Sequence, residues 1–174
     1  MNILVTGCNG FIGSTVARHL SMKGHHVYGT NRETLDITDE HALIRFFSTN
    51  SVDIVVHAAA KGGRRGKKDT AKDMYDNILM FENLSRLSRK YKLLISFGSG
   101  AELDRRYDIK NYKEEFSEYR VPVDYYGLSK RIISQRIKAW PDPTKMVNLR
   151  IFNCFGPTEA PDRMIKASIK RSLA

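Results

Sequence analysis

Short runs of apolar residues rich in valine and isoleucine alternate along the chain with longer segments that carry apolar residues at every third or fourth position. The runs are typical of buried strands, and the spacing of three and four is typical of helices with one apolar face. The predicted strands cover residues 2–6, 26–30, 52–57, 93–97 and 146–152. The predicted helices cover residues 11–23, 39–49, 71–90, 124–140 and 165–173. This alternation predicts an α/β fold in three layers, with a doubly wound parallel sheet between helices.

The composition is that of one folded domain over residues 1–174 and excludes several other classes of protein. With 41% hydrophobic residues the chain is too apolar to be disordered, and its 174 residues suffice for a sizeable core. No apolar run approaches the ~20 residues that a membrane-spanning helix needs, so no membrane partner is expected. Cys8 and Cys154 cannot form a disulfide framework, and the chain begins directly with a predicted strand, so we expect a cytoplasmic protein. The net charge of +10 favours an anionic partner.

A segment with three glycines joins the first predicted strand to the first predicted helix. Gly7 would permit a tight turn, Gly10 would let the backbone approach a pyrophosphate, and Gly13 would let the helix pack closely on the strand. The free N–H groups of the helix N-terminus would then face the phosphates. In this context the pattern predicts a Rossmann fold that binds a dinucleotide, although three glycines also suit a simple turn. The predicted cofactor-binding residues of this segment are Gly7, Asn9, Gly10, Phe11, Ile12 and Gly13.

The end of the second predicted strand distinguishes NADP from NAD. An acidic residue about 20 residues past the glycine segment would hold the ribose 2′-hydroxyl of NAD, whereas an arginine would hold the 2′-phosphate of NADP. Here Arg32 follows Asn31, and the nearest carboxylate is that of Glu33. Arg32 favours NADP, because a guanidinium pairs bidentately with phosphate; in the NAD alternative Arg32 is solvated and Glu33 reaches back to the ribose. Asp36 either accepts from the adenine amino group or caps the next helix, and Ile37 beside it is also predicted to contact the cofactor.

Further segments match one family of enzymes over essentially the whole chain. They are TGCNGFIG at 6–13, VHAAA at 56–60, YGLSK at 126–130 and LRIFNCFGP at 149–157, together with Asp36, Asp39, Asn77 and Ser99. On these segments the chain resembles an extended short-chain dehydrogenase/reductase of the NAD(P)-dependent sugar-nucleotide epimerase/dehydratase family. The resemblance implies that Ala58, Ala59 and Ala60 pass the nicotinamide ribose. It also implies that Asn77 supports the cofactor loop and that Asn153 faces the sugar nucleotide.

Tyr126 and Lys130 stand four residues apart in a predicted helix and therefore share one face. A phenol titrates near ~10, so Tyr126 needs a lowered pKa to exchange a proton with a sugar hydroxyl near neutral pH. The Lys130 ammonium and a positively charged nicotinamide would supply that lowering. By resemblance to the family, Lys130 would also hold the nicotinamide ribose, and Ser99 would hydrogen-bond the reacting oxygen. These residues predict hydride transfer; an amphipathic helix with an incidental tyrosine and lysine is the alternative.

Departures from the family narrow the expected reaction. Dehydratases carry an acidic pair directly after the catalytic hydroxyl, but Gly100 and Ala101 follow Ser99 here, which disfavours dehydration. The chain is similar in part to GDP-fucose synthase, an NADPH-dependent epimerase-reductase. That enzyme has a cysteine at the position of Ala101 and a histidine beyond its Gly-Pro, whereas residues 158–174 of this chain hold no histidine. A 4-ketoreductase or a 4-epimerase that acts on a nucleotide sugar is therefore expected.

The length of the chain leaves a second interpretation open. Family members usually continue well past the Gly-Pro to form a substrate lobe, which this sequence lacks, either as a truncated piece or as a natural short form. The alternative function is therefore a catalytically weak NAD(P)-binding module with a regulatory or binding role. The relatives also imply that two copies pair as a homodimer through the helices predicted at 71–90 and 124–140.

The densest cluster of positive charge lies at residues 61–68, directly after the third predicted strand. It either attracts the diphosphate of a nucleotide sugar, binds nucleic acid, or is a solvated loop. Nucleic acid is disfavoured, because no aromatic stacking platform accompanies the charge. The five histidines show no metal-binding spacing, so no metal site is expected.

Overall fold

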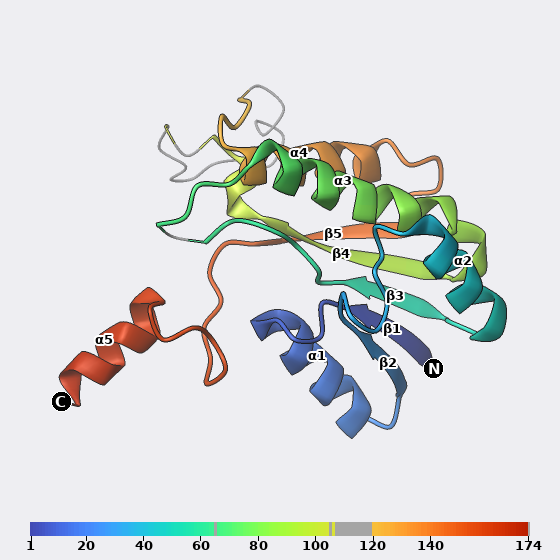
Figure 1. The fold of residues 1–174 in the computed structure, drawn as a ribbon, viewed down its shortest axis with the longest axis horizontal. Helices are drawn as coiled ribbons and strands as arrows, with labels where there is room; N and C mark the ends of the chain where they lie inside the picture. The colour runs from blue at the N-terminus through green and yellow to red at the C-terminus, as the bar shows by residue number, and fades with distance from the viewer. Residues whose placement is uncertain (65, 105, 107–119, 174) are drawn as a thin grey trace.

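The computed structural model of the chain contains a five-stranded parallel sheet in the order β2-β1-β3-β4-β5 (Figure 1). It describes residues 1–64, 66–104, 106 and 120–173. The strands are β1 (Asn2–Thr6), β2 (His26–Thr30), β3 (Ile54–His57), β4 (Leu93–Ser99) and β5 (Met146–Ile151). The helices are α1 (Phe11–Met22), α2 (Glu40–Thr49), α3 (Ala71–Arg86), α4 (Tyr125–Lys138) and α5 (Met164–Ser172), with two 3-10 turns, η1 (Ser88–Lys90) and η2 (Gly100–Glu102). The predicted α/β fold with a doubly wound parallel sheet is confirmed.

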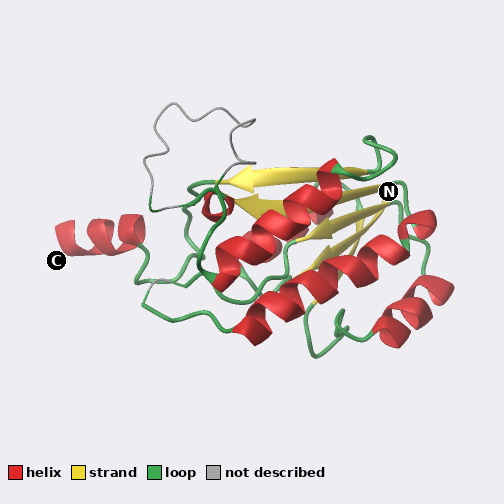
Figure 2. Ribbon diagram, turned by 90° about the horizontal axis from the view of Figure 1, so that it is seen from above, coloured by secondary structure: helices red, strands yellow, loops and turns green. Residues whose placement is uncertain are grey.

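Helices cover both faces of the sheet. The helices α2, α3 and α4 lie over one face and α1 lies over the other (Figures 1 and 2). Successive residues of a strand point to opposite faces, so each strand contributes to two cores. Leu4 and Val55 point into the larger core, which contains the apolar residues of α2, α3 and α4. Ile3, Val5 and Val56 form the smaller core, under α1.

The end of β4 lies further along the chain than predicted. The strand predicted at 93–97 continues to Ser99, because Ser99 pairs in register with Ile151 of β5. The turn η2 follows without an intervening loop. Ser99 is therefore the last residue of a central strand, and the sheet fixes its backbone.

Candidate active site

Two cavities lie at the carboxyl edge of the sheet. The first, the β1–β3 pocket, has a volume of about 230 Å³ and is lined by the segments that follow β1, β2 and β3. The second, the Tyr126 pocket, has a volume of about 390 Å³ and is lined from the ends of β4 and β5 and from α4. Ala58 and Ala60 line both cavities, which are therefore neighbours. The chain reverses its direction across the sheet between β1 and β3, and ligands of open α/β sheets bind at such a point.

The glycine segment between β1 and α1 shapes one wall of the β1–β3 pocket. Gly7 has a φ of +69°, and a Cβ there would lie 2.7 Å from the backbone of Ala59. A Cβ on Gly13 would lie 2.2 Å from the Gly7 carbonyl oxygen, so only glycine lets α1 pack this closely. Gly10 lines the pocket and is the N-cap residue of α1, and no side chain caps this helix end. The first N–H groups of α1 are thus available to an anion, an arrangement that fits a dinucleotide pyrophosphate.

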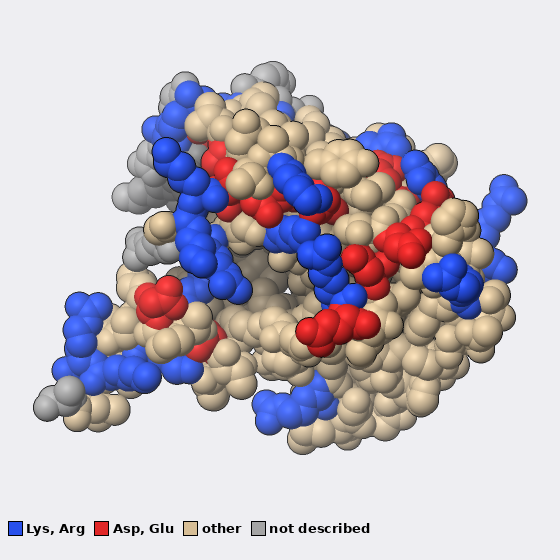
Figure 3. Space-filling view, in the orientation of Figure 1, with Lys and Arg blue, Asp and Glu red and all other residues tan. Residues whose placement is uncertain are grey.

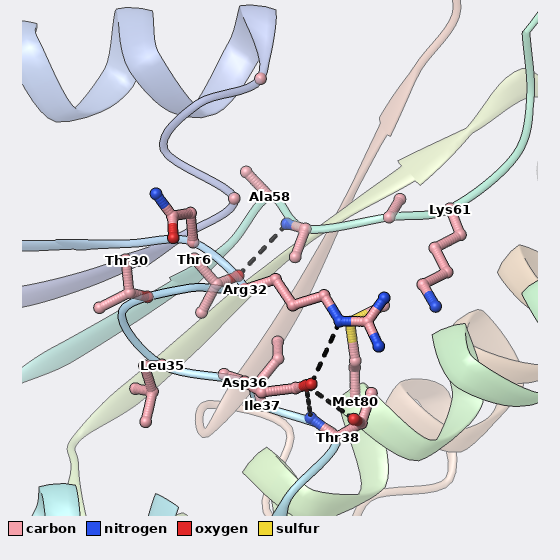
Figure 4. Close-up of a pocket in the computed structure, with 15 residues that line it drawn as sticks. Thr6, Thr30, Arg32, Leu35, Asp36, Ile37, Thr38, Ala58, Lys61 and Met80 are labelled. Carbon is pink, nitrogen blue, oxygen red and sulfur yellow. Dashed lines mark hydrogen bonds and ion pairs between the residues drawn. The ribbon is translucent and has the colours of Figure 1, made fainter. Parts of the chain in front are cut away.

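A polar turn after β2 forms the opposite side of the same pocket (Figure 4). Asn31 Oδ1 accepts hydrogen bonds from the backbone N–H groups of Glu33 at 2.8 Å and Thr34 at 3.0 Å. The side chains of Arg32 and Asp36 point toward one another, and Arg32 Nε donates to Asp36 Oδ2 at 3.3 Å. Arg32, with a side chain 74% exposed, lines the pocket and Glu33 does not. A cation rather than a carboxylate therefore lies at the tip of β2.

Asp36 is hydrogen-bonded within the chain. Its Oδ1 accepts from the Thr38 N–H at 2.9 Å and from the Thr38 hydroxyl at 2.6 Å. Burial raises the pKa of Asp36, but the hydrogen bonds from Thr38 and Arg32 outweigh burial, and the net pKa is lowered. The helix-cap alternative for Asp36 is wrong, because Asp39 caps α2. Asp36 and Ile37 both line the pocket, and their contact with adenine stays a prediction.

Buried side chains hold the segment that follows β3 at both of its ends. Thr6 Oγ1 shares a hydrogen bond with His57 Nδ1 at 2.9 Å and accepts from the Ala59 N–H at 3.2 Å. Asn77, on α3, is 1% exposed; its Oδ1 accepts from the Lys61 N–H at 2.7 Å and its Nδ2 donates to the Lys61 carbonyl at 3.0 Å. Asn77 thus has the contacts expected of a residue that supports this loop.

Tyr126, Lys130 and Ser99 come together in the Tyr126 pocket. Helix α4 carries the first two, and its cap Asp124 accepts a hydrogen bond from a first-turn N–H at 2.7 Å. Lys130 is 5% exposed and donates from Nζ to the Phe97 carbonyl at 2.7 Å. Its Nζ lies 5.8 Å from the centre of the Tyr126 ring. The i, i+4 spacing therefore places both side chains at one site, beside the end of β4.

The pKa of Tyr126 is raised, chiefly because the phenol is buried. A hydrogen bond with the Ser99 side chain and the positive charge of Arg163 act in the opposite direction. The negative charges of Asp69 and Glu102 raise this pKa further. In the chain alone, burial therefore outweighs the groups that lower this pKa, and the lowering by Lys130 together with a positively charged nicotinamide stays a prediction.

Lys130 has a strongly perturbed pKa. Burial lowers the pKa of Lys130 to about 8, and the carboxylate of Glu102 acts against this lowering. Lys130 is therefore mostly protonated at neutral pH, within a site where an ammonium group is difficult to solvate.

The basic segment after β3 passes over the Tyr126 ring. Gly63 has a φ of +70°, and a Cβ on it would lie 2.9 Å from ring atoms of Tyr126. The Gly63 N–H donates to Asp69 Oδ1 at 2.8 Å, which holds the loop in this position. Figure 3 shows Lys and Arg side chains beside a hollow on this face. The exposed cations of the segment are Arg64, Lys67 and Lys68, and Arg65 lies outside the described residues.

The remaining predicted residues divide between the cavity wall and supporting positions. Asn153 lines the Tyr126 pocket and is exposed, and Phe11 and Ile12 line the same pocket. Asn9 and Gly13 line neither cavity. Gly13 therefore has a packing role. Asn9 lies outside both cavities, and its contact with the cofactor stays a prediction.

Three charged residues of this region were missed by the sequence analysis. Arg163 lines the Tyr126 pocket and is exposed. Glu102 is 2% exposed beneath the pocket, and its Oε2 accepts from Arg150 Nε at 2.9 Å. The spacing Ser-x-x-Glu of Ser99 and Glu102 is a capping-box signal that marks Glu102 in the sequence. Arg150 lies within the family-matching segment at 149–157, where no role was assigned to it, and no local pattern marks Arg163.

Residues 1–64, 66–104, 106 and 120–173 contain neither a metal-binding cluster nor a membrane-spanning helix. No group of three or more His, Cys, Asp or Glu side chains there has the geometry to hold a metal ion. No helix within the same ranges has the length and apolar character required to cross a membrane.

The chain is similar to curated and solved proteins that modify nucleotide sugars. It is 27% identical to ADP-L-glycero-D-manno-heptose-6-epimerase from Cupriavidus pinatubonensis, over 92% of this chain and 53% of the relative. The structure matches a GDP-D-glycero-L-gluco-heptose synthase from Campylobacter jejuni, crystallised in the presence of NADPH, with a TM-score of 0.86, 20% identity, and coverage of 98% and 54% of the two chains. It matches a GDP-L-fucose synthetase from Naegleria fowleri, bound to NADP, with a TM-score of 0.79, 20% identity, and coverage of 99% and 61%.

The chain thus spans a little more than half the length of these proteins. The profile of the NAD dependent epimerase/dehydratase family matches residues 3–174. The glycine segment, the tyrosine and lysine on α4, and this match over nearly the whole chain lead to one conclusion. The chain belongs to the NAD dependent epimerase/dehydratase family.

Proposed function

We propose that this chain is the cofactor-binding and catalytic part of an NADP-dependent enzyme that transfers hydride at a carbon of a nucleotide sugar, as a 4-ketoreductase or a 4-epimerase. The observation that carries the proposal is the meeting of Tyr126, Lys130 and Ser99 in a pocket that adjoins the β1–β3 pocket at Ala58 and Ala60. A cofactor in one pocket would face a substrate in the other.

The residues of the β1–β3 pocket fit the parts of a dinucleotide. The uncapped start of α1 at Gly10 suits the pyrophosphate, and the segment at 58–60 suits the nicotinamide ribose. Arg32 suits the 2′-phosphate of NADP, since it lines the pocket and Glu33 does not. When bound, NADP supplies or accepts the hydride. The NADPH and NADP of the two structural neighbours favour the same cofactor, and NAD is the alternative.

Tyr126 would act as the general acid. A ketone that is reduced needs a proton on its oxygen, and the raised pKa of Tyr126 keeps its phenol protonated near neutral pH. Lys130, with its pKa of about 8, would stabilise the phenolate that remains after the proton has moved to the substrate oxygen. Ser99 Oγ accepts from the Ala101 N–H at 3.1 Å and can donate its own proton to the same substrate oxygen.

The side chains around the Tyr126 pocket favour simple hydride transfer over dehydration or 3,5-epimerisation. Those reactions remove a proton from carbon and need a second acid/base beside the tyrosine. Among the described residues that line the pocket there is no carboxylate and no imidazole, and its thiol, Cys154, follows β5 and not Ser99, where GDP-fucose synthase has its cysteine. Glu102, the nearest acidic residue after Ser99, faces Arg150 beneath the pocket. Arg163 adds an exposed cation that suits an anionic substrate.

The test is turnover of 4-keto nucleotide sugars with NADPH by the wild type and by Tyr126→Phe. Removing a general acid lowers the rate by about 10²- to 10⁴-fold. The dissociation constant of NADPH, measured by calorimetry, should stay within about twofold of the wild type, because the hydroxyl is not needed to hold the β1–β3 pocket. The matched control is Tyr125→Phe, which changes an exposed tyrosine on the same helix outside both cavities.

Equal rates for wild type and Tyr126→Phe would refute the acid role. Tight NADPH binding without turnover of any 4-keto nucleotide sugar would instead favour the cofactor-binding module.

A further inference from the structure

Glu102 is a buried carboxylate that contacts the backbone of Ser99, one of the candidate catalytic residues. It ends η2 and is 2% exposed, and it is not among the residues that line the Tyr126 pocket. Its Oε1 accepts from the backbone N–H of Ser99 at 2.9 Å. A Cβ on Gly98 would lie 2.2 Å from the same oxygen, so glycine at this position lets the carboxylate approach β4. Glu102 is therefore built into the end of the strand that presents Ser99.

The second oxygen of Glu102 is held from β5. Its Oε2 accepts from Arg150 Nε at 2.9 Å, and the Arg150 side chain is 15% exposed. Asn148 Nδ2 donates to Glu102 Oε1 at 3.3 Å and to Ser134 Oγ of α4 at 3.0 Å. The carboxylate is thus fixed by β4, β5 and, through Asn148, by α4. A buried ion pair of this kind costs desolvation and contributes little net stability, which makes a role in the neighbouring site the better explanation.

The charge of Glu102 reaches the two candidate catalytic groups on α4. It acts on Lys130 against the effect of burial, and it acts on Tyr126 in the same direction as burial. His57 of β3 also faces Lys130, and it is neutral near pH 7, because burial lowers its pKa to about 3. The other charged groups that act on Tyr126 are Asp69 and Arg163. Glu102 is therefore the anion that opposes the loss of the Lys130 proton.

We propose that Glu102 is a positioning residue, whose carboxylate holds the Ser99 backbone at the end of β4 and places a buried negative charge beside the site of Ser99 and Lys130. This inference rests on the proposed function, which assigns Lys130 and Ser99 their roles in catalysis. Its physical content, the charge state of Lys130, can be measured on the protein without substrate or cofactor.

Two substitutions separate the two roles of Glu102. Glu102→Gln keeps an oxygen that can accept from the Ser99 N–H and removes the charge. Its expected effect is a fall of about one pH unit in the titration midpoint of Lys130, because the nearest opposite charge has been lost. Glu102→Asp keeps the charge and shortens the reach to Ser99. It should leave the midpoint near that of the wild type and lower kcat by about tenfold through a displaced Ser99.

The measurement is the pH titration of the Lys130 side-chain signal by NMR in protein labelled at lysine, with the signal assigned from Lys130→Met. Arg150→Met should shift the titration midpoint of Lys130 upward, in the opposite direction, because it removes a positive charge. It also keeps the proposal testable if Glu102→Gln does not fold. The matched control is Glu82→Gln, which breaks the ion pair of Glu82 with Arg136 between α3 and α4 and should leave the midpoint unchanged.

Unchanged midpoints in both Glu102→Gln and Arg150→Met would overturn the proposal. A shift in the pH profile of kcat that follows the shifted midpoint in Glu102→Gln would support it. Equal turnover by Tyr126→Phe and the wild type would refute the proposed function alone. The titration of Lys130 would still decide the role of Glu102.

Discussion

The β1–β3 pocket and the Tyr126 pocket lie next to each other, and they are built in different ways. One wall of the β1–β3 pocket is a glycine segment in which a Cβ on Gly7 would collide with backbone, and the opposite side is a turn closed between near neighbours, such as Arg32 and Asp36. The Tyr126 pocket depends on buried charge held across the sheet. Lys130 of α4 binds the carbonyl of Phe97, and Glu102 pairs with Arg150 of β5.

Because of this difference, we expect the two pockets to be sensitive to different kinds of substitution. A wall made of close-packed backbone keeps its shape when a charge at the rim changes and is damaged by added volume, because the surrounding atoms are not free to move. A pocket made of buried charges is damaged when one member is neutralised, because its partner stays buried and uncompensated. Each of the following substitutions tests one side of this comparison.

The largest effect is expected at Gly13, where added volume meets backbone. A methyl group in Gly13→Ala would lie 2.2 Å from the Gly7 carbonyl oxygen, so α1 and the glycine segment have to separate. We expect a loss of about 3 kcal/mol in the free energy of unfolding, at the upper end for overpacking, and a fall in NADPH affinity of at least about tenfold. Urea denaturation and calorimetric titration measure the two effects.

The control for Gly13 is Gly24→Ala. Gly24 has a φ of +81° and no atom within 4 Å of a Cβ, so the substitution adds backbone strain without a collision. It should cost about 1 kcal/mol of stability and leave NADPH binding unchanged. If both variants lose the same stability and both keep the affinity for NADPH, close packing of the glycine segment does not shape the pocket.

A smaller and selective effect is expected at Arg32, on the rim of the β1–β3 pocket. Arg32→Ala removes a cation that is 74% exposed, so the fold should be unaffected. A charge-assisted contact with a phosphate contributes about 1.5–3 kcal/mol, so affinity for NADPH should fall by about 10- to 100-fold while affinity for NADH changes little. The control is Arg45→Ala, at an exposed position of α2 outside both cavities. Equal losses for NADPH and NADH, or none, would remove Arg32 from cofactor selection.

The same contrast explains how much of the molecule could be predicted from its sequence. The glycine segment and the pair on α4 are local patterns, and spacing alone placed Gly10 at a pocket and Tyr126 beside Lys130. Arg150 lies on β5 and Glu102 in η2, directly after β4, and only the register of β4 against β5 brings them together. Burial raises the pKa of Tyr126 in the chain alone, and the sequence, which shows the nearby cation, does not show the extent of that burial. Contacts and desolvation that depend on distant segments leave no local signal.

The last prediction concerns His57, which interacts with one residue of each pocket. It is 2% exposed at the end of β3, it shares a hydrogen bond with Thr6 of the β1–β3 pocket, and the charge of Lys130 acts on it. Burial, together with the charge of Lys130, lowers the pKa of His57 to about 3 from 6.5. Between pH 6.5 and pH 3, His57 is therefore protonated in the unfolded chain and neutral in the folded chain. Stability should fall as the pH falls from 6.5 toward 3, at about 1.4 kcal/mol per pH unit.

Urea denaturation at pH 7 and pH 5 checks this slope. The wild type should lose about 2 kcal/mol between these two values, and His57→Gln should lose much less, because glutamine takes up no proton. The control His41→Gln changes an exposed histidine of α2 and should keep the loss seen in the wild type. If His57→Gln kept the full loss, the acid sensitivity would belong to other groups. A reduced loss would show that His57 must stay neutral for the fold to hold.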